Sequence, residues 1–223
     1  MREGSPKVKV AVEFEAGVQF ELPDSALALW ERGELHDLLN LPHDGTRVEI
    51  IDGKIVVTTA PEFGHNFIAL ELTKCLARTA AESTWEAVGT SGIVFPDALA
   101  GYIPDLVVVE SSIYYAAAEA QVRRLTSDEI EMVVEVTSGG SAQNDRPRPK
   151  SGGGKWEGYV SMEIPYYLLI DRDPKVRRTT LYSVPDPARQ IYALNESWAF
   201  GETISLPEPF NLEIPTSKWY DWQ

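Results

Sequence analysis

Residues 103–159 contain three segments that decide the fold: IPDLVVVE at 103–110, EMVVEVTS at 131–138 and KWEGY at 155–159. The first two are short Val-rich runs typical of buried β-strands, and the third is typical of the start of a helix. Each segment brings a charged residue into apolar surroundings, namely Asp105, Glu135 and Lys155. Such charges are costly unless a partner compensates them, so these three residues are the first candidates for a functional site.

Asp105 opens its strand, whereas Glu135 lies near the end of the next one. If the two strands are antiparallel neighbours, the start of one lies beside the end of the other, and both carboxylates emerge at one edge of the sheet. Two carboxylates suit a hard cation such as Mg²⁺ or Mn²⁺, and Lys155 can orient a water. The alternative, which spacing alone leaves open, is that each carboxylate caps a strand end or pairs with a nearby arginine.

Close acids without a cation have two consequences that we predict. At least one carboxylate should have a raised pKa, because like charges repel and burial disfavours ionisation. Removal of either Asp105 or Glu135 should for the same reason raise the stability of the metal-free protein.

The bulk composition is that of a globular protein. The chain has 223 residues, of which 43% are hydrophobic, and we expect a single domain over residues 1–223. No apolar run is long enough to span a bilayer, and the start of the sequence, MREGSPKVKVAVEFE, has no apolar leader, so we expect a cytoplasmic protein and no membrane partner. The net charge of −14 argues against broad binding to polyphosphates.

Local patterns predict a mixed α/β fold with a central sheet. Residues 1–22 alternate like an extended arm or edge hairpin, and Asp52-Gly53 is a strong hairpin turn. The segment 138–154, rich in Gly, Pro and charge, is predicted to be a mobile loop. The remaining predicted elements are helices starting near residues 25, 34, 65, 111 and 155, and strands near 85–96, 165–173, 177–184, 189–195 and 211–215.

The sequence does not match several well-known functional motifs. Gly152-Gly153-Gly154-Lys155 is not a phosphate-binding loop, because Pro149 stands at the first glycine position and Trp156 at the Ser/Thr position. The sequence has no G-x-S-x-G element. Its three histidines, His36, His43 and His65, are not paired at i, i+4, so a His-rich zinc site is not expected.

Two further residues have open interpretations. Glu49, in an otherwise apolar strand, is either an ordinary outward-facing residue or a third acidic group of the site. His65, at a helix start, either bonds to the backbone or contacts a phosphate or a metal-bound water, since a helix N-terminus favours anions.

The chain resembles the Uma-two family of restriction-endonuclease-like proteins, within the PD-(D/E)XK nuclease superfamily. The matching features cover roughly residues 40–175 in the family's order: RVEIIDGKI (47–55), PEFGHNF (61–67), IPDLVVVE, VVEVTS (133–138), NDR (144–146) and KWEGYVSMEIPYYLLID (155–171). The resemblance implies a restriction-endonuclease-like core at 40–175: a central mixed sheet flanked by helices, with extra antiparallel strands at both ends, the C-terminal ones in a strand-rich extension at 176–223.

The resemblance also implies the site. Asp105 and Glu135 are the first and second acids and, with the backbone carbonyl of Val136, the ligands of Mg²⁺ or Mn²⁺. The superfamily lysine normally sits two residues after the second acid, where this chain has Thr137. Lys155, four residues before a tyrosine, matches a lysine that has migrated to the following helix, and Lys150 is its competitor. Glu49 and His65 also match family positions, and we expect both to belong to the catalytic residues.

The implied function is a Mg²⁺- or Mn²⁺-dependent DNA endonuclease that binds DNA weakly without metal, and we expect a homodimer. The alternative is a catalytically inactive nuclease-fold binding module that acts through protein partners, which the acidic surface favours. Geometry discriminates between them. Carboxylates of Asp105 and Glu135 within a shared coordination distance, with Lys155 pointing at them, support the enzyme. A solvent-facing Lys155 and no metal-sized gap support the binding module.

Overall fold

The computed structural model describes residues 22–78, 84–89, 91–95, 98–148 and 153–222. The expected N-terminal arm and the competitor Lys150 therefore lie outside the described residues. The helices are α1 (Ala26–Arg32), α2 (Glu34–Leu38), α3 (Phe63–Arg78), α4 (Ser111–Glu119), α5 (Ala142–Asp145) and α6 (Lys155–Ser161), with a 3-10 turn at Ser127–Glu129. The strands are β1 (Arg47–Ile51), β2 (Lys54–Thr58), β3 (Trp85–Gly89), β4 (Gly92–Phe95), β5 (Ala100–Tyr102), β6 (Leu106–Glu110), β7 (Arg124–Leu125), β8 (Met132–Val136), β9 (Tyr166–Asp171), β10 (Arg178–Asp186), β11 (Ile191–Ala199), β12 (Thr203–Leu206) and β13 (Leu212–Pro215).

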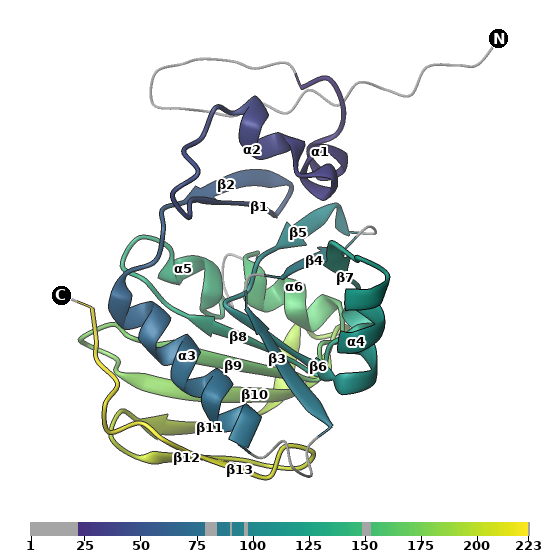
Figure 1. The fold of residues 1–223 in the computed structure, drawn as a ribbon. Helices are drawn as coiled ribbons and strands as arrows, with labels where there is room; N and C mark the ends of the chain where they lie inside the picture. The colour runs from purple at the N-terminus through teal and green to yellow at the C-terminus, as the bar shows by residue number, and fades with distance from the viewer. Residues whose placement is uncertain (1–21, 79–83, 90, 96–97, 149–152, 223) are drawn as a thin grey trace.

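A six-stranded mixed sheet forms the centre of the molecule, in the order β11-β10-β9-β8-β6-β3 (Figure 1). Strands β8 and β9 are parallel and every other neighbouring pair is antiparallel. The expected antiparallel pairing of β6 with β8 is confirmed, with Leu106 opposite Val134. The start of β6 therefore lies beside the end of β8, as the placement of both acids at one edge requires.

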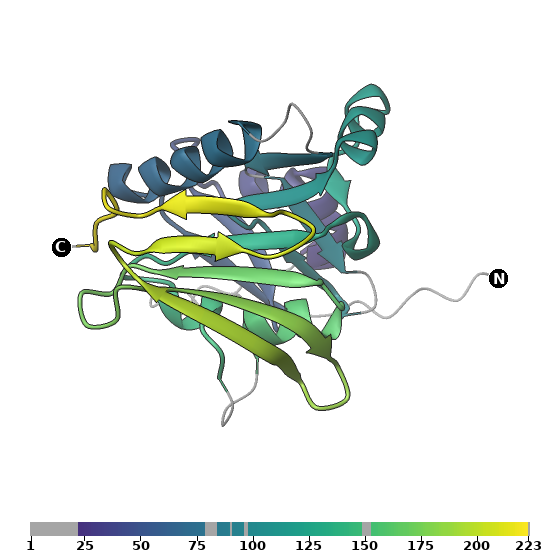
Figure 2. The same ribbon diagram turned by 90° about the horizontal axis from the view of Figure 1, so that it is seen from below.

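Different elements cover the two faces of this sheet. One face packs on α3 and on the β12–β13 hairpin, which are drawn in blue and yellow in Figure 2. The other face packs on α6 and on a second sheet with the order β2-β1-β5-β4-β7. Helices α1 and α2 close the far side of that second sheet, so the molecule is layered (Figure 1). None of its described helices is both long and apolar enough to cross a membrane.

The β1–β2 hairpin forms where it was predicted. Asp52 and Gly53 both have positive φ, at 53° and 70°, which is the backbone that a tight hairpin turn requires. Helix α1 begins as predicted too, with the Ser25 side chain accepting a hydrogen bond from the amide of Ala28. The C-terminal strands are antiparallel as expected, but β10 and β11 extend the central sheet itself.

Two segments contain elements that the sequence did not indicate. The segment 138–154, predicted to be a mobile loop, contains the short helix α5, and Asp145 at its end is buried. The polar stretch after α4, where no strand was predicted, contains the short strand β7, which pairs in parallel with β4. Both elements are held by tertiary contacts that local composition does not record.

Candidate active site

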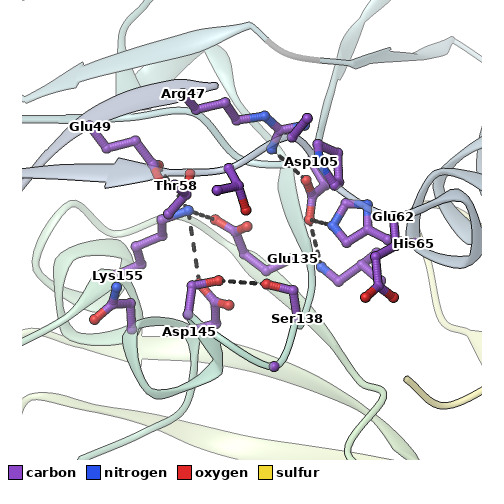
Figure 3. Close-up of a pocket in the computed structure, with 18 of the residues that line it drawn as sticks. Arg47, Glu49, Thr58, Glu62, His65, Asp105, Glu135, Ser138, Asp145 and Lys155 are labelled. Atoms are coloured by element: carbon purple, nitrogen blue, oxygen red, sulfur yellow. Dashed lines mark hydrogen bonds and ion pairs between the residues drawn. The ribbon is translucent and has the colours of Figure 1, made fainter. Parts of the chain in front are cut away.

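A polar cavity of about 400 Å³ lies between the two sheets, at the end of β8 and the start of β6. Figure 3 shows charged side chains converging there from both sheets and from three helices. The strand β1 supplies Arg47 and Glu49, and α3 supplies His65. The remaining charged groups that line it deep inside are Asp105, Glu135, Asp145 and Lys155.

Strand periodicity explains why these side chains meet. Along β8, Val134 and Val136 pack toward α3, so Glu135 between them points to the opposite face. Val107 packs on that same opposite face, and Asp105 lies two residues before it. In β1 the buried Val48 and Ile50 face α1, so the alternate positions Arg47 and Glu49 face the central sheet. Alternation with period two thus delivers all four charged groups into one space.

Asp105 is the most fully bonded acid of the site. Its Oδ2 accepts hydrogen bonds from the Val136 amide at 2.8 Å and from His65 Nε2 at 2.9 Å, while Oδ1 pairs with an Arg47 guanidinium nitrogen at 2.7 Å. The side chain is only 4% exposed. Burial raises its pKa, but the hydrogen bond and charge of His65 and the charge of Arg47 outweigh burial and lower the pKa of Asp105 to about 2.

Lys155 is buried and joins three acids. Its Nζ lies 2.8 Å from Glu49 Oε1, 3.0 Å from Glu135 Oε1 and 3.9 Å from Asp145 Oδ1. Burial alone would lower the pKa of Lys155, but the surrounding carboxylates raise it well above its ordinary value. Lys155 is therefore a permanent ammonium group, and it lies against the second of the two acids, Glu135.

Glu135 has the opposite environment to Asp105. Its Oε1 accepts from Lys155 and, at 2.6 Å, from the Tyr159 hydroxyl. Burial raises the pKa of Glu135 to about 7; Lys155 opposes this, and the charges of Asp105 and Glu49 add to it. Burial and the charge of Glu135 likewise raise the pKa of Asp145. The prediction that at least one carboxylate has a raised pKa is confirmed.

The donor set fits a hard divalent cation. Counting two lone pairs on each oxygen, Asp105 keeps one acceptor site on Oδ1 and Glu135 keeps Oε2 after the interactions above. The Val136 carbonyl points to the same side as its amide, toward Asp105. Oxygen donors of this kind suit Mg²⁺ or Mn²⁺, which keep several waters and need few protein ligands. Four buried carboxylates, at 49, 105, 135 and 145, face only Arg47 and Lys155, so a divalent cation would favour the ionised form of the acids whose pKa is raised.

The two open interpretations take a definite form in the structure. Glu49 is 3% exposed, accepts the Ile103 amide at 2.7 Å and pairs with Lys155, so it is a third acidic group of the cavity. The ring of His65 donates from Nε2 to the Asp105 carboxylate, and its Nδ1 is buried with no hydrogen-bond partner among the described residues.

Three contributors went unassigned in the sequence. Arg47 shares the strand face of Glu49, so the alternation of RVEII could have indicated it. Tyr159 lies one helical turn after Lys155, and this i, i+4 spacing puts both on the face of α6 that meets Glu135. Asp145 lies in a segment without periodicity, and no local signal marks it as buried.

The Uma2 family, described as "putative restriction endonuclease", matches residues 34–217. The chain belongs to this family. Among solved structures, a putative nuclease belonging to DUF820 from Anabaena variabilis ATCC 29413, determined by crystallography at 1.96 Å resolution, is similar in fold, with a TM-score of 0.52. The identity is 18%, over 82% of this chain and 94% of that chain. No curated protein matches the chain.

The Uma2 assignment confirms the family that the sequence motifs indicated, and it supports a nuclease function. The structural likeness confirms the mixed α/β nuclease-like fold, with a central sheet flanked by helices.

We expected that removing either acid would stabilise the metal-free protein. For Asp105 this expectation needs revision, because the fold stabilises its ionised form. For Glu135 we keep it as a prediction, and the gain in stability should depend on pH. The pKa of Glu135 rises from an ordinary 4.5 to about 7 on folding, so the folded protein keeps a proton that the unfolded chain has lost, and stability falls as pH rises through this window. Glu135→Gln removes that fall. We expect its stability advantage over the wild type to grow by about 2 kcal/mol between about pH 5.5 and pH 8.5, in urea unfolding without metal.

Asp105→Asn is the matched control, because we expect it to lower the stability that Glu135→Gln raises. The pKa of Asp105 is lowered, so its ionised form stabilises the fold above its ordinary pKa of 3.8, and the variant should lose about 2 kcal/mol over the whole range just named. A pH-independent effect of Glu135→Gln would show that Glu135 does not hold a proton in the folded protein.

Proposed function

We propose that this chain is a Mg²⁺- or Mn²⁺-dependent endonuclease that hydrolyses phosphodiester bonds in DNA. One observation carries the proposal: buried Lys155 points into the cavity and lies 3.0 Å from Glu135, while Asp105, on the adjacent strand, lines the same cavity. An ammonium group is costly to bury, and a protein that only needed a stable core would gain as much from apolar residues there.

The chain's own residues divide the work of hydrolysis. Asp105, Glu135 and the Val136 carbonyl would hold the metal, which supplies Lewis-acid stabilisation of the phosphate and lowers the pKa of a bound water. His65 and the Val136 amide fix the Asp105 carboxylate in one orientation. Lys155, itself anchored by Glu49, orients the attacking water and stabilises negative charge that develops on the phosphate.

Arg47 is suited to bind the phosphate. One of its guanidinium nitrogens pairs with Asp105. Its side chain is 18% exposed, more than those of Glu49, Asp105, Asp145 and Lys155. An arginine presents several donors in a fixed plane and so can bridge a carboxylate and a phosphate together. The cavity also has neutral hydrogen-bonding groups for the DNA backbone, contributed by Thr58, Thr59, Ser138, Ser141 and Asn144.

The binding-module alternative has its own support. Asp105 already pairs with Arg47, and Glu135 with Lys155, as structural ion pairs would. Two features favour the enzyme over it. Lys155 is buried among acids instead of facing solvent, and the buried part of the cavity holds four carboxyl groups but only two cationic side chains, Arg47 and Lys155. A purely structural network is expected to balance its charges. The homodimer and the cytoplasmic location stay predictions.

Loss of either acid should abolish cleavage. We expect Asp105→Asn and Glu135→Gln each to lower Mg²⁺-dependent nicking of supercoiled plasmid by at least about 100-fold, because each removes a negative ligand while conserving side-chain shape. Nicking is measured over a series of Mg²⁺, Mn²⁺ and Ca²⁺. Ca²⁺ should support little or no cleavage, since its looser coordination orients water poorly. Glu213→Gln, on an exposed position of β13, is the control and should nick like the wild type. Wild-type rates in either site variant would mean that the site is wrongly assigned.

The catalytic lysine can be tested separately. Lys155→Ala should lose about 100-fold in nicking rate or more, because its ammonium group is held in place by three acids. Lys150→Ala should lose less than about fivefold, since Lys150 lies in a Pro/Gly-rich sequence that is poorly suited to precise geometry. Far-UV circular dichroism in Mg²⁺ would confirm that both variants are folded. A greater loss at Lys150 would overturn the assignment of Lys155.

A further inference from the structure

A second cluster of metal-binding side chains lies outside the cavity. His36 and Asp37 on α2 meet His43, from the turn that follows, and one ligand atom of each lies within 4.8 Å of the others. Asp37 Oδ1 is 3.2 Å from His43 Nε2 and 4.0 Å from His36 Nδ1. Over the described ranges of the chain, this is the only group of three His, Cys, Asp or Glu residues that is so compact. The two histidines are seven residues apart in sequence, a spacing that had argued against a zinc site. The turn after α2 nevertheless brings His43 back beside His36.

One ring nitrogen of the cluster makes no hydrogen bond to any described residue, although it is buried. This nitrogen is His36 Nδ1. The ring of His43 stacks against that of His36, with centroids 4.6 Å apart, which helps to shield it. A buried imidazole nitrogen without a partner costs free energy, and a bound cation on that atom would remove the cost.

The chemistry of the donors selects the kind of ion. Two imidazole nitrogens and one carboxylate oxygen form a borderline-soft set that suits Zn²⁺ and similar transition ions better than Mg²⁺. Bonds of about 2.0–2.1 Å in a tetrahedron put ligand atoms about 3.3 Å apart. The pair Asp37–His43 already has that separation, and the pair His36–Asp37 needs to close by less than 1 Å. The His43 side chain is 78% exposed, so its ring has space to rotate.

We propose that His36, Asp37 and His43 form a Zn²⁺-binding site distinct from the catalytic cavity. The ion would tie α2 to the chain that enters β1, four residues before Arg47. His36 and Arg47 also line one shared, largely apolar groove of about 320 Å³, together with Trp30 and Leu35. The site would therefore brace the segment that carries Arg47, and it does not depend on the nuclease assignment.

The chain's three histidines make the test direct. Imidazole resonances of the full chain, without a polyhistidine tag, are followed by NMR as Zn²⁺ is added. The first equivalent should shift the signals of His36 and His43 and leave His65, on Asp105, unmoved. In calorimetry one Zn²⁺ should bind per chain, and His36→Ala and His43→Ala should each weaken its affinity by at least about tenfold.

A matched variant controls for charge. Glu34→Gln removes an exposed carboxylate from the same helix, and Glu34 pairs with Arg32 instead of with the cluster. It should leave Zn²⁺ affinity unchanged, whereas Asp37→Asn should weaken it. If the first equivalent moves only His65, or if both histidine variants bind Zn²⁺ as tightly as the wild type, the proposal is wrong. Absence of binding at micromolar Zn²⁺ would also overturn it and leave the cluster as a surface ion pair.

Discussion

Asp105 makes the interaction on which the candidate site depends. Its amide continues the β6–β8 ladder by donating to the Val134 carbonyl at 3.1 Å, and its carboxylate accepts the Val136 amide two residues further along β8. The side chain thus takes the place of a backbone acceptor just before β6 begins. The same interaction fixes the position of the first acid and the end of the strand that carries Glu135. Backbone pairing and placement of the acids are therefore one structural feature.

The other constraint is the burial of four carboxyl groups on one side of the central sheet. Their surroundings differ, and so do their pKa values. Asp105 is kept ionised by His65, Arg47 and a backbone amide, while Glu135 has a pKa near neutrality despite its contact with Lys155. Paired groups whose environments separate their pKa values are common in catalytic sites. Asp105 is then suited to be a permanently charged ligand, and Glu135 to exchange a proton for a cation.

Much of this arrangement could be predicted from sequence because strands impose a strict period. Val-rich runs interrupted by Asp105 and Glu135 indicated two buried strands, and the family motifs added Lys155. Asp145 could not be found this way, since it is buried by tertiary packing of a segment whose composition indicates a loop. The meeting of His36 with His43 is another case, because a turn, unlike a helix or strand, gives no fixed spacing.

The central claim is that the buried acids form a binding site for a divalent cation. It is tested most directly by the melting temperature of the wild type and of the Asp105→Asn/Glu135→Gln double variant as Mg²⁺ or Mn²⁺ is added. A ligand that binds only the folded protein raises its stability with concentration. We predict that the wild-type melting temperature rises with metal and that the double variant does not respond. Equal responses, or no response in either protein, would contradict the metal site and leave the binding module as the better account.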